Sequence, residues 1–190
     1  MEKISELLEA ARVRAIAVVR GIDDGQLGDP TPCTEFDVRD LVSHLFHVVA
    51  NFRALAAREP SEFGDAPDVV TGDWRGRFEE ETARLVEAWG VPGAEDGVTG
   101  RMGMPARTVG LMALGDLTVH AWDLARATGQ DFEPDEAVVD EVGPGLAAMA
   151  PQARKGKVFG EPFPVPAGAT AFEQALAVTG RDPGWRSPRV

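Results

Sequence analysis

The sequence predicts an all-α protein built around a four-helix bundle. Three observations lead to this prediction. Four long segments repeat apolar side chains at helical spacing, two long connections separate them, and a short, more irregular segment follows at the C-terminal end. Bundles of this kind place ligand and metal sites in their core, on side chains from facing helices, so inward-facing polar residues become the candidates for function.

The first predicted helix covers residues 2–21 and ends before an Asp-Asp-Gly sequence, which interrupts the apolar periodicity. A loop with two prolines follows at 27–33. The second helix is expected over 34–58, with Thr34 as its N-cap and Asp37 three residues later as an imperfect capping box.

A third helix is expected over residues 73–89, after a polar loop. The stretch 90–105 is rich in Gly and Pro, and part of it, 98–104, is expected to be extended. The fourth helix covers 107–128 and ends at Gly129, a residue typical of helix C-termini. This helix is apolar nearly all round, which predicts that it is buried.

The C-terminal part is expected to contain a fifth helix over 135–149, weakened by a Gly-Pro-Gly sequence, then an extended segment at 158–166. A short helix over 170–179 completes it. We therefore expect residues 1–150 to form the helical bundle and residues 151–190 to form an extension packed on the same domain.

Composition excludes several classes of function. The formal net charge is −12, from 31 acidic and 19 basic residues, which argues against binding to nucleic acid or to anionic membrane surfaces. A single cysteine excludes an intramolecular disulfide framework. The sequence contains no long apolar run and no pattern of a secretory signal, so we expect a cytoplasmic protein, monomeric or homodimeric, with a small-molecule substrate.

Asp116 and His120 are the first candidates for chemistry. They are four residues apart on the fourth predicted helix, and four residues turn by ~400°, so both side chains lie on one face. The surrounding residues are apolar, and a buried carboxylate needs a compensating cation. A metal ion bound by both side chains supplies one, whereas a buried Asp–His hydrogen bond is the structural alternative.

His44 favours the metal. It lies beside apolar residues of the second predicted helix, and Asp40, one turn earlier, is a candidate to orient its ring. Two histidines and one carboxylate suit zinc with an open coordination position, and they also suit ferrous iron. A core histidine bonded to a backbone carbonyl is the alternative for His44 alone.

Other polar residues are assigned around this set. Asp123 is a candidate second partner of a ligand histidine, although it could instead pair with Arg126. His47, Asn51 and Arg107 are candidates to line the substrate pocket. Cys33 precedes the second helix, and because no basic residue adjoins it in sequence, we interpret it as a packed residue and not as a reactive thiol.

Two motifs carry a resemblance to a known family. The segment Pro30-Thr-Pro-Cys-Thr-Glu-Phe-Asp-Val-Arg-Asp-Leu-Val-Ser-His-Leu45 resembles the opening motif of the mycothiol-dependent maleylpyruvate isomerase N-terminal family, within the DinB-like superfamily of metalloenzymes. The segment Leu114-Gly-Asp-Leu-Thr-Val-His-Ala-Trp-Asp-Leu-Ala-Arg-Ala-Thr-Gly129 is similar to its second motif. The tail, with Phe159-Gly-Glu-Pro-Phe-Pro-Val-Pro166 and Thr179-Gly-Arg-Asp-Pro183, is similar to a short, uncharacterised branch.

The resemblance implies a DinB-like bundle with a divalent metal on His44, Asp116 and His120, the same residues that the spacing selects. In the isomerase, Glu stands where this chain has Asp116, which is one methylene shorter, so the position of the metal can differ. About sixty residues follow the fourth predicted helix, too few for the sterol-carrier-like domain of the isomerase. The substrate therefore does not transfer with the resemblance.

The sequence thus predicts a divalent-metal protein, with zinc favoured over nickel or ferrous iron. Its expected chemistry uses a low-molecular-weight thiol such as mycothiol, which metal binding would deprotonate for transferase or isomerase reactions on a small electrophile. Two alternatives remain open: a non-catalytic module that binds a metal or small ligand, and a metal-dependent hydrolase that uses bound hydroxide.

Overall fold

The computed structural model of the chain describes residues 2–188 and confirms the all-α prediction. The helices are α1 (Ile4–Arg20), α2 (Val38–Ala56), α3 (Trp74–Gly90), α4 (Ala106–Thr128), α5 (Glu136–Lys155) and α6 (Ala171–Val178). A one-turn 3₁₀ helix, η1 (Asp24–Gln26), follows α1. The strands β1 (Val98–Thr99) and β2 (Met104–Pro105) form a small antiparallel hairpin before α4.

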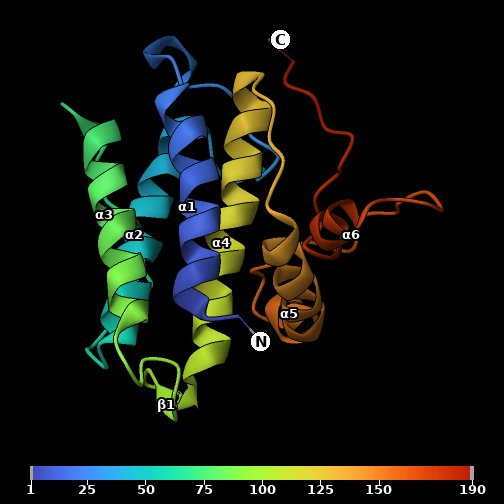
Figure 1. Cartoon of the computed structure of the whole chain (residues 1–190). Coiled ribbons are helices and arrows are strands. Elements are labelled where there is room, and N and C mark those ends of the chain that lie inside the picture. The colour runs from blue at the N-terminus through green and yellow to red at the C-terminus, as the bar shows by residue number, and fades with distance from the viewer. Residues whose placement is uncertain (1, 189–190) are drawn as a thin grey trace.

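Helices α1 to α4 form the bundle (Figure 1). Helix α1 packs against α3 and α4, and α2 packs against the same two helices, so each helix has two neighbours around a common core. The apolar stripes predicted from the sequence meet in this core, where burial of each large side chain stabilises the fold by roughly 1.5–3 kcal/mol. Its fully buried side chains include Leu7, Leu8, Leu41, Leu45, Phe78, Leu85, Leu114 and Leu117.

Helix α4 is the most buried helix because it contacts α1 and α2 on one side and α5 on the other. A Cβ atom on Gly110 would lie 2.8 Å from Ile4 Cγ2, so the absence of a side chain there lets α1 approach closely. Gly129 ends the helix in the left-handed conformation, with φ of 72°, as the sequence predicts. Polar groups on α4 therefore lie inside the protein unless they are near its ends.

Two local predictions need correction. Helix α2 is capped by Asp37, whose side chain accepts a hydrogen bond from the Asp40 amide, and not by Thr34. Helix α5 continues to Lys155, so the boundary expected at residue 150 falls inside a helix. Both prolines within α5 are exposed, while its buried stripe continues past them, through Val138, Val142, Leu146 and Ala150, so that burial outweighs the lost backbone hydrogen bonds.

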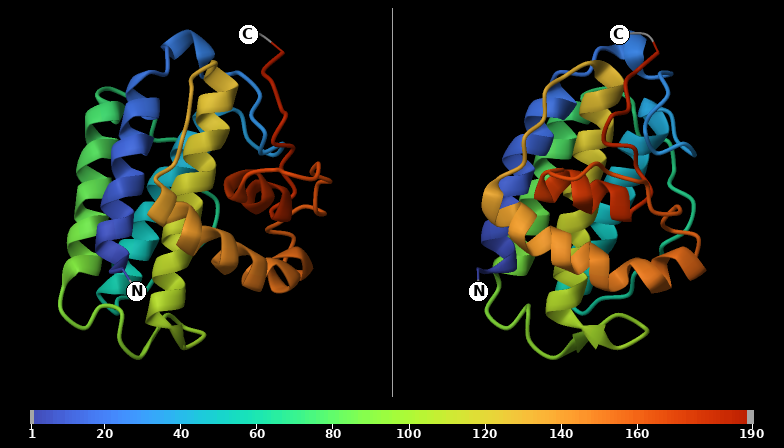
Figure 2. Two further views of the ribbon diagram at one scale, coloured as in Figure 1. Left: turned by 45° about the vertical axis from the view of Figure 1, so that its right-hand side comes forward. Right: turned by 90° about the vertical axis from the view of Figure 1, so that its right-hand side faces the viewer.

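The C-terminal segment lies beside α4 and α5 (Figure 2). Helix α6 packs on α5, and the residues expected to be extended, 158–166, form neither helix nor strand. Here two stretches of backbone cross closely: the Gly160 amide donates to the Thr179 carbonyl at 3.1 Å, and Gly180 has a φ of +92°. A Cβ on Gly180 would lie 2.7 Å from the Cα of Gly160, so this crossing requires glycine.

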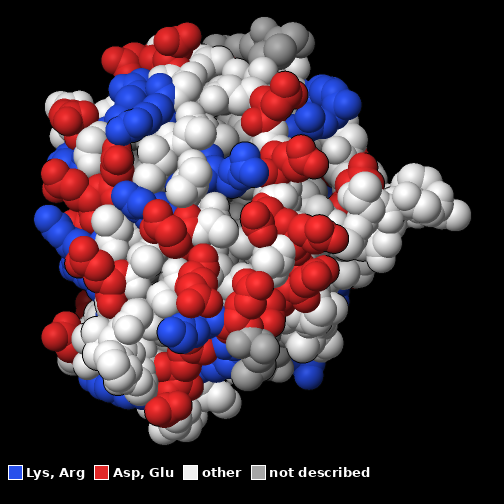
Figure 3. Space-filling model, viewed as in Figure 1, with Lys and Arg blue, Asp and Glu red and all other residues white. Residues whose placement is uncertain are grey.

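Within the described residues, no helix combines the length and the apolar character needed to span a lipid bilayer. On the face shown in Figure 3, acidic side chains outnumber basic ones, and the two kinds are interspersed. This surface agrees with the net charge of −12.

Candidate metal centre

His44 on α2 and His120 on α4 face each other between two neighbouring helices of the bundle. Their ring centroids are 5.0 Å apart, and the rings meet edge to face at 85°. Phe36 stacks on the other side of His44, at 5.1 Å between centroids. Burial, with smaller contributions from His120 and the other positive groups nearby, lowers the pKa of His44 from 6.5 to about 4. His44 is therefore neutral at pH 7, which is the form that binds metal ions.

Asp116 lies one turn before His120 on the same face of α4. Its carboxylate makes no hydrogen bond and no ion pair within residues 2–188. Burial raises the pKa of Asp116, although the nearby His120 and Arg181 oppose the shift. Asp116, for which the sequence predicts a compensating cation, thus lies beside the histidine pair without a direct partner.

Asp123, one turn after His120, is fully buried and does have partners. Its Oδ2 lies 2.9 Å from His120 Nδ1. The guanidinium of Arg181 approaches both carboxylate oxygens, with Nη2 2.9 Å from Oδ2 and Nε 3.2 Å from each oxygen. Burial alone would raise the pKa of Asp123, but Arg181 and the hydrogen bond to His120 together lower it, so Asp123 is a carboxylate. Arg126 does not pair with it and lies over the ring of Trp122 instead.

Cys33 is partly buried next to His120 and Asp123. Cys33, His120 and Asp123 each offer a ligand atom, and these atoms lie within 4.8 Å of one another. Burial raises the pKa of the Cys33 thiol to about 11, although Arg181 opposes this shift. The thiol is therefore protonated at pH 7 in the metal-free chain, as expected of a packed cysteine.

Two residues assigned from the sequence lie away from the histidine pair. Asp40 is exposed in the first turn of α2, and its side chain makes no hydrogen bond to His44 in the described structure. Arg107 lies in the first turn of α4, about 20 Å along the helix axis from His120. It forms ion pairs there with Glu95 and Glu141.

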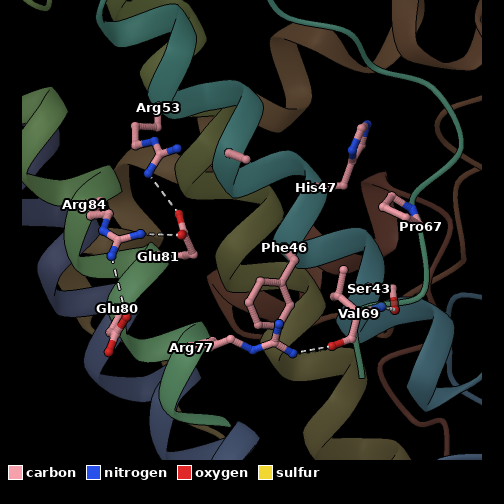
Figure 4. A pocket seen from close by; sticks show the side chains of 11 residues that line it. Ser43, Phe46, His47, Arg53, Pro67, Val69, Arg77, Glu80, Glu81 and Arg84 are labelled. Atoms are coloured by element: carbon pink, nitrogen blue, oxygen red, sulfur yellow. Dashed lines mark hydrogen bonds and ion pairs between the residues drawn. The ribbon is translucent and has the colours of Figure 1, made fainter. Parts of the chain in front are cut away.

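His47 and Asn51 bond to each other and to the loop after α2, and not to the histidine pair. The Asn51 amide lies 3.3 Å from His47 Nε2, and Asn51 Oδ1 accepts from the Glu62 amide. His47 lines a cavity of about 430 Å³ between α2 and α3. Figure 4 shows its other wall, where Arg53 and Arg84 are paired with glutamates of α3. The lining of this cavity does not include His44 or His120.

Arg181 is the residue of this centre that sequence reasoning misses. It follows the glycine crossing in the C-terminal segment, 58 residues after Asp123. The Thr-Gly-Arg-Asp-Pro sequence around it resembles the tail of a family branch but carries no spacing that would connect it to α4. A buried arginine in an otherwise polar tail could be found only from the folded structure.

The fold and this centre define the class: a DinB-like helical bundle with two histidines and the buried Asp123 between α2, α4 and the C-terminal segment, and with the half-buried Asp116 one turn before His120. The model of the mycothiol maleylpyruvate isomerase N-terminal domain family matches residues 8–125. The chain belongs to this family. The matched region contains the first motif and most of the second, which continues to Gly129, and it ends before Arg181.

Two relatives come from strains of Mycobacterium tuberculosis, and each is described as an uncharacterized protein. Each is 31% identical to this chain over 172 residues, which cover 87% of this chain and 90% of the relative. An alignment of this length cannot be confined to the four bundle helices, so the similarity extends beyond α4. No solved structure shows significant similarity to the chain.

Proposed function

We propose that the chain binds a divalent metal ion, with zinc the best fit, through His44, Asp116 and His120. The observation that carries this proposal is that the ring centroids of the neutral His44 and of His120 are 5.0 Å apart, next to Asp116, a carboxylate without a direct partner. Two imidazoles and one carboxylate are a donor set that zinc accepts while retaining an open position. Binding of an ion would also compensate the charge of Asp116.

A second donor set, Cys33 with His120 and Asp123, is closer together but fits an ion less well. The Arg181 guanidinium already occupies both oxygens of Asp123 and lies 3.5 Å from His120 Nδ1. A divalent ion at that position would meet a buried positive charge. His120 has a second ring nitrogen, Nε2, which remains available for the set with His44 and Asp116.

We further propose that the centre serves a thiol-dependent transferase or isomerase reaction on a small electrophile. When bound, the metal supplies positive charge that lowers the pKa of an incoming thiol. Membership of the family supports a thiol of the mycothiol type. The chain's own contribution is to hold its ligand side chains: Phe36 packs on the ring of His44, and Asp123 fixes Nδ1 of His120.

Metal content is tested first, by elemental analysis of the purified protein and by zinc titration of the metal-free chain. His44→Ala is expected to abolish tight binding. His47→Ala is the matched control, because His47 lies on the same helix but faces the separate cavity, and it should leave binding unchanged. Equal zinc affinity in wild type and His44→Ala would refute this metal site.

Thiol dependence is tested by turnover of a panel of small electrophiles, with and without added thiol. The cobalt-loaded protein should also show a thiolate charge-transfer band when the thiol is added. Turnover that needs no thiol would refute the transferase proposal in favour of hydrolysis. Metal binding with neither turnover nor a thiol band would indicate a binding module.

A further inference from the structure

Arg181, in the C-terminal segment, contacts both carboxylate oxygens of Asp123. Both side chains are buried, with 8% of Arg181 and none of Asp123 exposed. Three nitrogen–oxygen contacts of 2.9–3.2 Å join the guanidinium to the two carboxylate oxygens. Such a planar, two-pronged contact fixes the orientation of the carboxylate, which a single point charge would not do.

The backbone that carries Arg181 is itself held in place. The close crossing of Gly160 and Gly180 sets the direction in which the chain leaves α6. Thr179 Oγ1 accepts a hydrogen bond from Arg181 Nη1 at 3.1 Å, and Arg154 donates to the Val178 carbonyl. The guanidinium therefore reaches α4 from a segment anchored on both sides, and it does not depend on a loose tail.

This contact bears on where the proton of His120 lies, since Nδ1 is closer to Asp123 Oδ2, at 2.9 Å, than to Arg181 Nη2, at 3.5 Å. Arginine is always protonated and donates only, so the pair requires Asp123 as a carboxylate, which accepts only. Oδ2 lies 2.9 Å from both Arg181 Nη2 and His120 Nδ1. A hydrogen bond from the ring to that oxygen needs the proton on Nδ1, and the neutral ring then carries its lone pair on Nε2.

We propose that Arg181 is the positioning residue of the centre: by fixing Asp123, it holds His120 as the Nδ1-protonated tautomer and reserves Nε2 for the metal ion. The effect on metal affinity rests on the proposed function, whereas the tautomer is a property of the metal-free chain. The C-terminal segment, which lies outside the region matched by the family model, is then part of the functional centre.

The tautomer can be measured directly, because the chain has only three histidines. Nitrogen-15 NMR of the metal-free protein, labelled at histidine, distinguishes protonated from unprotonated ring nitrogens, and His44→Gln and His47→Gln assign the remaining signals to His120. In the wild type, His120 is expected to be protonated on Nδ1 alone. A proton on Nε2 in the wild type would overturn the proposal.

Variants then test whether Arg181 is the cause. Arg181→Met is expected to give mixed tautomers at His120 and a tenfold to hundredfold lower zinc affinity. Arg181→Lys retains the charge but not the planar fork, so it should recover most of the Nδ1 form and part of the affinity. Arg186→Met is the matched control, because Arg186 is exposed in the same segment and bonds only to nearby carbonyls. Neither the tautomer nor the affinity should change in this control.

The outcomes separate the two proposals. An unchanged tautomer and unchanged zinc affinity in Arg181→Met would overturn the positioning role. If Arg181→Met does not fold, the wild-type spectrum and Arg181→Lys still decide: a wild-type tautomer and full affinity in Arg181→Lys would show that charge alone suffices and overturn the need for the fork. An Nδ1-protonated ring in a protein that binds no zinc would refute the proposed function alone.

Discussion

Asp116 offers the sharpest test of the metal centre, because its carboxylate lies inside the fold beside His120 without a hydrogen bond or ion pair to any described residue. The substitution Asp116→Asn removes that charge while keeping the size of the side chain. A half-buried charge without a direct partner destabilises the folded state, so the metal-free variant should be more stable than metal-free wild type at pH 7, by about 1 kcal/mol. In most core positions an Asp→Asn change would not be expected to stabilise.

The response to zinc should be the reverse. An ion that binds only the folded state at 100 times its dissociation constant stabilises it by about 2.7 kcal/mol. For a chain of 190 residues, each kcal/mol raises the melting temperature by roughly 2–4 °C, so zinc should raise the wild-type value by roughly 5–11 °C. Asp116→Asn lacks the anionic ligand, and we expect it to lose most of this increase.

Thermal and urea unfolding, each with chelator and with zinc, measure both effects. Asp140→Asn is the matched control, because it removes the same charge from an exposed position on α5. It should change neither the metal-free stability nor the response to zinc. The reasoning would be refuted by an Asp116→Asn variant that is less stable than wild type without metal and still gains the full increase with zinc.

Three further predictions concern the surroundings of the centre. The pKa of His44 is about 4 in the folded state and about 6.5 when unfolded, so the unfolded chain binds the proton more tightly. The free energy of unfolding of the metal-free protein should therefore fall by up to about 3 kcal/mol as pH falls from 6.5 to 4. Urea unfolding at a series of pH values measures this dependence, which should become weaker in His44→Gln. The raised pKa of Cys33, about 11, predicts that iodoacetamide at pH 8 alkylates the native chain roughly a hundredfold more slowly than the urea-unfolded chain, and equal rates would contradict the burial of this thiol. Gly180→Ala places a Cβ 2.7 Å from Gly160 at positive φ and should cost about 1–3 kcal/mol, whereas Gly145→Ala on α5, with open space around it, should cost nothing or stabilise by up to about 1 kcal/mol in the same unfolding assay.

The bundle could be predicted from the sequence because each of its helices repeats a buried stripe. The C-terminal end of α5 could not, since local propensity assigns a penalty to each proline, and only the fold shows that both prolines are exposed while Ala150 is buried. The N-cap of α2 was assigned to Thr34 where Asp37 caps it, because several residues in that turn have suitable side chains.

The approach of His44 to His120 could be predicted from the faces of their helices. Positions along the helix axes could not be predicted in the same way. His44 and His120 were expected to meet because both lie on inward faces, and the structure brings them within 5.0 Å. Arg107 was assigned to the same pocket although thirteen residues of helix, about 20 Å, separate it from His120. Arg181 has no periodic pattern and is brought to α4 only by the path of the backbone after α6.

The long sequence separation between Asp123 and Arg181 has a consequence for how the protein is made. All four bundle helices have been synthesised once residue 128 leaves the ribosome, whereas Arg181 emerges 53 residues later. If the bundle folds during that interval, it must hold Asp123 without its arginine until synthesis ends. Polypeptides released before residue 181 would keep an unpaired acidic group in their interior, and quality-control proteases would thereby distinguish them from finished chains.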